Sequence, residues 1–147
     1  MPRLFFDTSA LVKRYYEEAG PETVDELVEA EGNEVVITSL SVVETASALR
    51  RKQNRGEITS RDVDRLLGAF FEEALDEFVV LPVDESFSGT ALDLVLEADL
   101  RTLDSLQLAA ALSISSDTSG PVFVCADRDL VDVAARRGLE TQNPESS

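Results

Sequence analysis

The chain has 147 residues, with 13 lysine and arginine residues against 29 aspartate and glutamate residues, a net charge of −16, and no histidine. A chain of this length buries enough surface for one hydrophobic core, and its single cysteine, Cys125, excludes an intrachain disulfide and a cysteine-rich zinc site. Without histidine there is no serine–histidine triad and no histidine-ligated metal, so any metal here is a hard ion held by oxygen.

The first half of the chain alternates short apolar runs with longer amphipathic segments. The run at 3–6 predicts a strand, and Thr8 or Ser9 is suited to cap the helix that follows. Gly20 and Pro21 end that helix, and Pro21 is a favourable first residue for the next one. In chain order we expect a strand at 3–6, helices from 8 or 9 to about 18 and from 21 to about 31, a strand at 35–38, and helices from 39 or 41 to 55 and from 59 or 60 to 77.

The second half continues this alternation. We expect a strand at 78–83, helices at 84–98 and 102–115, a turn at 117–121, a strand at 122–125, a helix at 130–137 and a short strand at 139–142. Strands and helices that alternate in this way predict a three-layer α/β/α sandwich with a mostly parallel central sheet. We expect residues 1–142 to form a single domain and residues 143–147 a flexible C-terminal tail.

The charged residues are distributed unevenly by type. Only Lys13 and Lys52 are lysines, so 13 − 2 leaves 11 arginines, and the acids are spread along the whole chain. This composition resembles that of proteins from halophilic archaea, because concentrated salt shortens the range of charge repulsion to roughly 3 Å. An ordinary acidic domain is the alternative interpretation. By itself the acidic excess argues against a nucleic-acid partner.

The apolar stretches are too short for a membrane protein. The longest, such as 78–83 and 108–112, fall well below the roughly 18 residues that a membrane span requires. Asp7 interrupts the first apolar run, so the N-terminus does not resemble a signal peptide. We expect a cytoplasmic protein without a membrane partner.

Two aspartates follow predicted strands. Asp7 comes directly after the strand at 3–6, and Asp127 follows the strand at 122–125. Ligands of open parallel sheets bind beyond the carboxyl ends of the strands, so both side chains are expected where such a site would lie. The alternative is that each aspartate only caps the helix that begins there.

Two further acids stand in apolar surroundings. Glu44 has no cation three or four residues away on its predicted helix, and Asp104 opens a very apolar helix for which Thr102 is a plausible cap. The alternatives are an exposed helix face for Glu44 and compensation of the helix dipole by Asp104, which is worth roughly 0.3–1 kcal/mol. If all four acids converge, their repulsion requires a cation, and Mg²⁺ or Mn²⁺ fits a set of carboxylates.

The order of these motifs resembles the PIN domain, in particular the VapC-type toxin ribonucleases of type II toxin–antitoxin pairs. The successive acids are 37, 60 and 23 residues apart (44 − 7, 104 − 44, 127 − 104), and the resemblance covers residues 3 to about 142. It departs from the family at Cys125, where many members have threonine or serine. The matching segments are Phe6-Asp7-Thr8-Ser9-Ala10, Ser41 to Arg51 around Glu44, Leu100 to Ala109 around Asp104, and Phe123 to Leu130 around Asp127.

The resemblance implies a Mg²⁺- or Mn²⁺-dependent endoribonuclease in which a metal-activated water attacks the phosphodiester. Asp7 and Asp104 would be the principal ligands, Asp127 a further ligand, and Glu44 a ligand or a group that orients the metal-bound water. Possible supporting or phosphate contacts come from Thr8, Ser9 and Asp129, and the last of these is the alternative to Asp127 as the acid after the strand.

The same resemblance implies partners. They are RNA, a small VapB-like antitoxin and a second copy in a homodimer. Arg50, Arg51, Lys52 and Arg55 form the best candidate RNA-binding strip, with a solvated basic face as the alternative. The apolar segments 24–28 and 66–71 provide either partner surfaces or core.

Other function classes are weaker or stay open. A receiver-type phosphoacceptor needs a lysine after a late strand, and a phosphatase of the haloacid-dehalogenase type needs a second aspartate where this chain has Ser9. Two alternatives within the same fold are an RNA-processing nuclease outside toxin–antitoxin systems and a non-catalytic PIN-like binding module.

Overall fold

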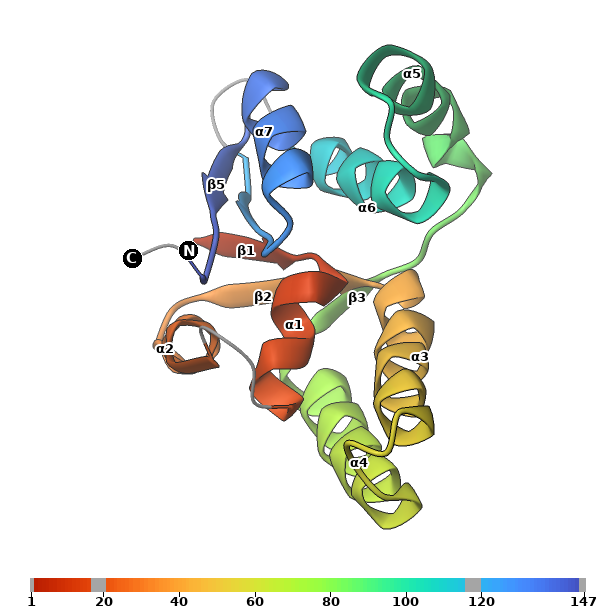
Figure 1. Cartoon of the computed structure of the whole chain (residues 1–147). Coiled ribbons are helices and arrows are strands. Elements are labelled where there is room, and N and C mark those ends of the chain that lie inside the picture. The colour runs from red at the N-terminus through yellow and green to blue at the C-terminus, as the bar shows by residue number, and fades with distance from the viewer. Residues whose placement is uncertain (1, 17–20, 116–119, 146–147) are drawn as a thin grey trace.

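The computed structural model describes residues 2–16, 21–115 and 120–145. In this part of the chain a five-stranded sheet has the order β3-β2-β1-β4-β5, and every neighbouring pair is parallel. The predicted α/β sandwich with a mostly parallel sheet is therefore confirmed (Figure 1). The strands are β1 (Arg3–Phe6), β2 (Glu34–Thr38), β3 (Val79–Leu81), β4 (Val122–Val124) and β5 (Glu140–Gln142).

Side-chain caps mark where several of the helices begin. Asp7, Thr38 and Asp127 each accept a hydrogen bond from a backbone N–H in the first turn of the helix that follows their strand. At the other end of the last helix, Gly138 adopts a φ of 93° and turns the chain toward β5. The helices are α1 (Thr8–Tyr15), α2 (Pro21–Glu29), α3 (Ser39–Asn54), α4 (Ser60–Glu77), α5 (Ser88–Ala98), α6 (Thr102–Ser113) and α7 (Arg128–Arg136), with a 3₁₀ turn, η1 (Glu85–Phe87), before α5.

The central strands of the sheet are buried on both faces, and the alternation of side chains along β1 shows how. Phe5 points to the face covered by α5, α6 and α7, where it stacks on Phe123 with ring centroids 5.7 Å apart. Leu4 and Phe6 point to the opposite face and pack in the cluster that contains Phe70 of α4. The central strands are therefore held rigidly between two apolar layers.

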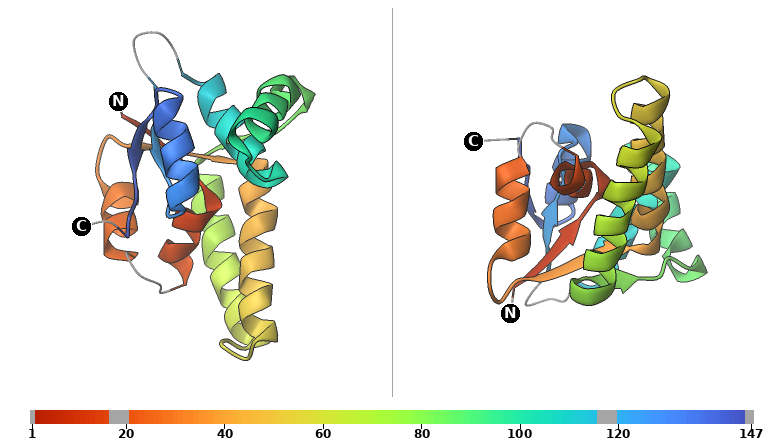
Figure 2. Two further views of the ribbon diagram at one scale, coloured as in Figure 1. Left: turned by 45° about the horizontal axis from the view of Figure 1, so that its top comes forward. Right: turned by 90° about the horizontal axis from the view of Figure 1, so that it is seen from below.

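Because all strands run in one direction, their carboxyl ends share one edge of the sheet. Phe6 at the end of β1 pairs in register with Val124 at the end of β4, so Asp7 and the residues after Val124 emerge side by side. The helix α3 leaves the end of β2 and lies beside α4, and the two extend beyond the sheet (Figure 2). Helix α3 forms a wall next to the edge where the aspartates emerge.

The structure differs from the sequence-based elements mainly at their ends. Helix α1 ends at Tyr15, because the backbone of Tyr16 is already extended. Residues 17 and 18 of its expected length, like most of the turn at 117–121, lie outside the described residues. The expected helix at 84–98 begins with the separate turn η1, because Asp84 caps that turn. No described helix is both long enough and apolar enough to cross a membrane.

The expected tail also differs over its described part. Pro144 is buried, and Glu145 forms an ion pair with Lys13 at 2.9 Å. Asn143 supports this arrangement because its side-chain oxygen accepts a hydrogen bond from the backbone N–H of Glu145. Residues 143–145 are thus attached to the domain, through contacts with α1 that only the tertiary fold creates. Residues 146 and 147 lie outside the described part.

Candidate functional site

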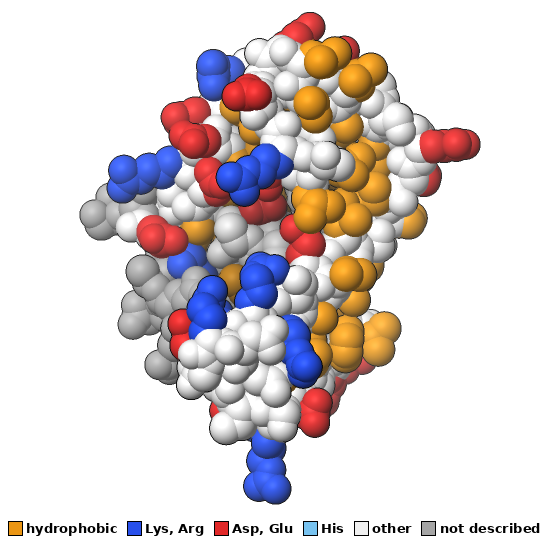
Figure 3. All heavy atoms as spheres, turned by 45° about the vertical axis from the view of Figure 1, so that its right-hand side comes forward, with side chains coloured by type: hydrophobic (Ala, Val, Ile, Leu, Met, Phe, Trp, Pro, Cys, Tyr) orange, Lys and Arg blue, Asp and Glu red, His pale blue; other side chains and the backbone are white. Residues whose placement is uncertain are grey.

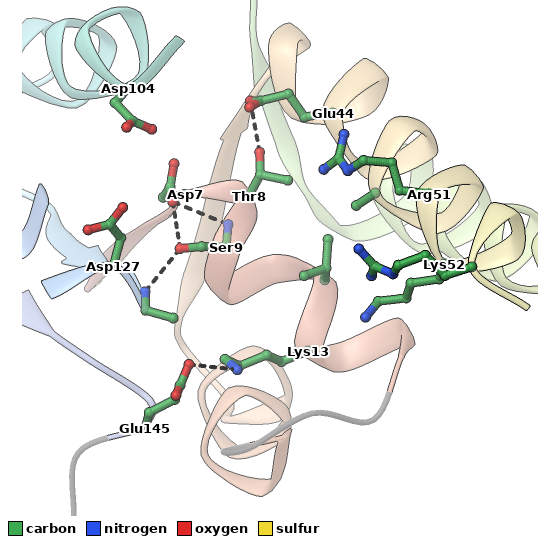
Figure 4. A pocket seen from close by; sticks show the side chains of 14 residues that line it. Asp7, Thr8, Ser9, Lys13, Glu44, Arg51, Lys52, Asp104, Asp127 and Glu145 are labelled. Atoms are coloured by element: carbon green, nitrogen blue, oxygen red, sulfur yellow. Dashed lines mark hydrogen bonds and ion pairs between the residues drawn. The ribbon is translucent and has the colours of Figure 1, made fainter. Parts of the chain in front are cut away.

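A pocket of about 510 Å³ lies at the carboxyl edge of the sheet. It is lined from α1, α3, the start of α6 and the segment after β4, and the four predicted acids all line it (Figure 4). The space-filling view shows a hollow with acidic side chains on one side and basic side chains on the other (Figure 3). The four acids are Asp7, Glu44, Asp104 and Asp127.

Asp7 is the most deeply placed of these acids, with only 5% of its surface exposed. One carboxylate oxygen, Oδ2, accepts hydrogen bonds from the backbone N–H of Ser9 at 3.2 Å and from the Ser9 hydroxyl at 2.7 Å. The thiol of Cys125 lies 3.6 Å from the same oxygen. Burial raises the pKa of Asp7 above its ordinary value, and these hydrogen bonds reduce the rise without cancelling it.

Ser9 also connects the two strand ends. Its hydroxyl oxygen accepts a hydrogen bond from the backbone N–H of Ala126, just before Asp127. Asp127 in turn caps α7, and its Oδ1 accepts the N–H groups of Asp129 and Leu130. Asp7 and Asp127 therefore both cap a helix and line the pocket. A role as a helix cap does not exclude a role in a metal site.

Glu44 is held by a buried polar network. Its Oε1 accepts a hydrogen bond from the Thr8 hydroxyl at 3.0 Å and one from the amide of Gln107 at 2.8 Å. Gln107 is fully buried and also contacts Ser41 and Thr38. The network fixes one oxygen of Glu44, and the side chain lines the pocket rather than an exposed helix face.

Asp104 has the clearest electrostatic response to the other acids. Partial burial and the charges of Asp7, Asp127 and Glu44 together raise its pKa to about 6, against a smaller opposite effect of Arg101. Arg101, not Thr102, is the residue at the cap position of α6, and its side chain makes no capping hydrogen bond. Asp104 is thus half-buried in a field of like charge, which is an unfavourable place for an isolated carboxylate.

The chemistry of this donor set fits a hard divalent cation. The pocket offers carboxylate oxygens from four acids whose mutual repulsion a cation would relieve. Among the described residues, no three acidic or thiol side chains already lie close enough together to enclose an ion. The residues that would hold Mg²⁺ or Mn²⁺ are Asp7, Asp104, Asp127 and Glu44, and their number and type suit ions that retain several waters.

The opposite wall of the pocket is basic. Arg51 and Lys52 of α3 line it, together with Arg55 just after that helix and Lys13 of α1 (Figure 4). Lys52 lies over the ring of Tyr16, 4.0 Å from its centroid. This juxtaposition of acidic and basic walls is suited to a polyanion that also binds a metal.

Two predicted residues do not line the pocket. Arg50 is exposed and donates a hydrogen bond to Gln53, because it faces away from the pocket on the same helix as Arg51. Asp129 is exposed in the first turn of α7. Of the apolar segments 24–28 and 66–71, Val24 and Phe70 are fully buried core residues.

Four residues of the site were not predicted from the sequence: Ser41, Gln107, Lys13 and Glu145. Gln107 left a signal, because it is the one polar residue in the run from Leu106 to Leu112, three positions after Asp104. Ser41 and Lys13 belong to residue types that are common in helices, so the sequence around them gave no indication of a role in the site. Glu145 was assigned to the tail, and only the fold brings it to Lys13.

Comparisons with known proteins agree with this geometry. The family model described as the PIN domain matches residues 4–136. The structure of FitAB bound to a DNA fragment is similar, with a TM-score of 0.73 and 15% identity over 98% of this chain and 96% of that one. No curated protein was found to match the sequence.

Two further solved structures have the same fold. VapC20 from Mycobacterium tuberculosis, described as a toxin that cleaves the sarcin–ricin loop, gives a TM-score of 0.68 with 16% identity, covering 92% of this chain and 95% of that one. A toxin–antitoxin complex from Klebsiella pneumoniae gives a TM-score of 0.64 with 14% identity, covering 96% and 97%. At these identities the similarity concerns the fold.

Proposed function

We propose that this chain, which belongs to the PIN domain family, is a Mg²⁺- or Mn²⁺-dependent endoribonuclease. We further propose that it is the toxin of a type II toxin–antitoxin pair. PIN domains are generally nucleases. One observation carries the proposal: acids from four separated segments line a single pocket at the carboxyl edge of the parallel sheet. The proposal includes a cytoplasmic location, because RNA and an antitoxin would be met there.

The acidic residues of the pocket would hold the metal ion. When bound, the metal ion would supply an activated water and would neutralise charge on the scissile phosphate. Asp7, Asp104 and Asp127 would hold the ion, while Glu44 would hold it or orient its water. Ser9 fixes the carboxylate of Asp7, and Gln107 fixes that of Glu44, so both acids are positioned before substrate arrives.

The test is cleavage of a pooled RNA substrate by the purified protein with Mn²⁺ or with EDTA, in concentrated KCl, which screens the repulsion of a chain with a net charge of −16. We expect fragments only in the presence of Mn²⁺. Fragments of equal yield in EDTA would contradict metal dependence. Intact RNA in every reaction, with folded protein that still binds RNA, would favour a non-catalytic binding module instead.

The basic wall is expected to bind the phosphodiester backbone. We predict that replacing Arg51 and Arg55 by glutamine weakens binding of single-stranded RNA and reduces the slope of log K against log[KCl] by about 1.4, or about 0.7 for each lost contact. Arg50→Gln is the matched control on the same helix, since Arg50 does not line the pocket. Fluorescence anisotropy over a KCl series measures both quantities, and an equal slope change in the control would refute the assignment.

The homodimer of the proposal has a candidate surface, which we call the apolar face. Hydrophobic side chains are gathered beside the pocket in the space-filling view (Figure 3). The exposed members on α3, α5 and α6 are Val43, Leu92, Val95, Leu96 and Leu103, and Leu96 has 73% of its surface exposed. A second copy fits this face because a two-fold interface pairs the same patch with itself, and uncharged patches let two strongly acidic copies meet.

We predict that Leu96→Glu makes the protein monomeric at concentrations where the wild type is a dimer, because the substitution buries a carboxylate in the interface. Sedimentation equilibrium measures the mass. Asn54→Glu adds the same charge at the end of α3 outside the apolar face, and it should leave the dimer intact. A dimeric Leu96→Glu protein would place the interface elsewhere.

The remaining partner of the proposal is a small VapB-like antitoxin. A toxin–antitoxin complex is among the proteins of similar fold. A basic side chain from such a partner would be attracted to the four acids and would compete with the metal ion there. An RNA-processing nuclease outside toxin–antitoxin systems would share the pocket and lack this partner, and a reading frame for a small protein beside the gene distinguishes the two.

A further inference from the structure

Lys13 is a buried cation at one end of the pocket. It lies on α1, the helix that Asp7 caps, and only 2% of its side-chain surface is exposed. Its ammonium group lies 2.9 Å from a carboxylate oxygen of Glu145. Lysine is almost never buried without a partner, because removing its charge from water is costly.

The two members of this pair are held very differently. Lys13 is packed into the domain on a helix whose neighbours Leu11 and Val12 are buried. The Glu145 side chain is 42% exposed and belongs to the segment after β5, where Asn143 and the buried Pro144 hold the backbone. The carboxylate is therefore the member that can exchange with solvent and with other anions.

Lys13 and Glu145 lie where the backbone of a bound RNA would pass. Lys13 and Glu145 line the same pocket as the four acids and the basic residues of α3, and both project toward it (Figure 4). Lys13 stands six residues after Asp7, about 9 Å along the helix at about 1.5 Å per residue. A nucleic-acid strand with one phosphodiester at the acids therefore has a further cation within reach along its backbone.

A carboxylate and a phosphodiester present the same kind of acceptor to an ammonium group, namely a singly charged oxygen anion. We propose that Lys13 is a phosphodiester-binding residue of this pocket and that the carboxylate of Glu145 occupies it until a nucleic-acid strand displaces it. This inference rests on the proposed function, because it assigns a subsite for the RNA backbone. Glu145 then acts as a competitor built into the chain, which lowers RNA affinity without touching the acids.

The test compares binding of a short single-stranded RNA to the full chain and its variants by fluorescence anisotropy over a KCl series, in EDTA so that no cleavage occurs. We expect Glu145→Gln to bind RNA about twofold to fivefold more tightly than the wild type, the range expected for loss of a partly exposed ion pair. Glu140→Gln is the matched control. It removes the same charge from an exposed position on β5 and should change affinity less.

Lys13→Met should weaken RNA binding and reduce the salt slope by about 0.7, and Glu145→Gln should have no effect in that background. Equal affinities for the wild type and Glu145→Gln, or equal gains in Glu140→Gln, would overturn the subsite while RNA cleavage by the wild type still stood. If neither the wild type nor Glu145→Gln binds RNA, the proposed function fails and the subsite with it. Because Glu145→Gln does not alter the buried lysine, the test does not depend on Lys13→Met folding.

Discussion

Replacing Asp7 by asparagine is expected to reduce RNA cleavage by more than about 100-fold while the fold stays intact. Changes to groups that only support a metal ligand already cost about 10-fold to 100-fold, so loss of a ligand charge should cost more. The fold should tolerate asparagine because the described hydrogen bonds to the Asp7 side chain converge on one oxygen, Oδ2, which the amide oxygen can replace. Asparagine is also a favourable cap for α1.

The measurement is the single-turnover cleavage rate in saturating Mn²⁺, with circular dichroism and the melting temperature as checks of folding. Asp129→Asn provides the matched control. It changes the same type of residue, two positions after Asp127, at an exposed site outside the pocket. A folded Asp7→Asn protein that cleaves within about tenfold of the wild-type rate would remove Asp7 from the metal site.

The second large effect concerns stability without metal. The pKa of Asp104 is about 6 in the folded protein, against an ordinary value of 3.8. Below about pH 3.8 the Asp104 carboxyl is protonated in both the folded and the unfolded protein, and it then does not reduce the stability of the fold. As the pH rises through 6, the folded protein has to accept an unfavourable charge, so stability that is present in acid is lost toward neutral pH.

Asp104→Asn should therefore be more stable than the metal-free wild type at pH 8, and the difference should vanish near pH 4. The pKa shift of about two units corresponds to about 3 kcal/mol at most, and partial exposure of the side chain to solvent reduces it substantially. The favourable contact of the carboxylate with the start of α6 offsets a further 0.3–1 kcal/mol or so. The expected net gain is about 1 kcal/mol, or about 2–4 °C in melting temperature.

Thermal melting over a pH series in EDTA at fixed KCl measures this gain. Asp93→Asn removes one carboxylate at an exposed position of α5 outside the pocket, and it is the control for the change in net charge. Addition of Mn²⁺ should reverse the order, because an ion at 100 times its Kd stabilises the wild type by about 2.7 kcal/mol. A wild type that stays less stable than Asp104→Asn in saturating Mn²⁺ would contradict a ligand role for Asp104.

Local sequence pattern predicted the architecture and drew attention to the four acids that line the pocket. The run at 3–6 followed by Asp7, and the run at 122–125 followed by Asp127, identify two strand ends and two caps from neighbouring residues alone. Glu44 was recognisable because it has no cation three or four residues away, and Asp104 because it opens a very apolar helix. Such signals depend on residues within four positions of one another, which the sequence displays directly.

Contacts between distant segments could not be predicted in the same way. Gln107 joins α6 to Glu44 on α3, 63 positions apart, and its several partners exist only after the sheet has brought those helices together. Lys13 and Glu145 meet from opposite ends of the chain. Arg50 and Arg51 are adjacent and chemically identical, and only the rotation of α3 decides that Arg51 lines the pocket and Arg50 does not.

The most direct test of the central claim, that these acids jointly hold a divalent ion, is a Mn²⁺ titration followed by the electron paramagnetic resonance signal of free Mn²⁺. The wild type and an Asp7→Asn, Asp104→Asn double variant are compared in the same concentrated KCl. We predict saturable binding of one or two ions by the wild type and loss of that binding in the folded double variant. Equal binding by the two proteins, or none by the wild type, would contradict a shared metal site.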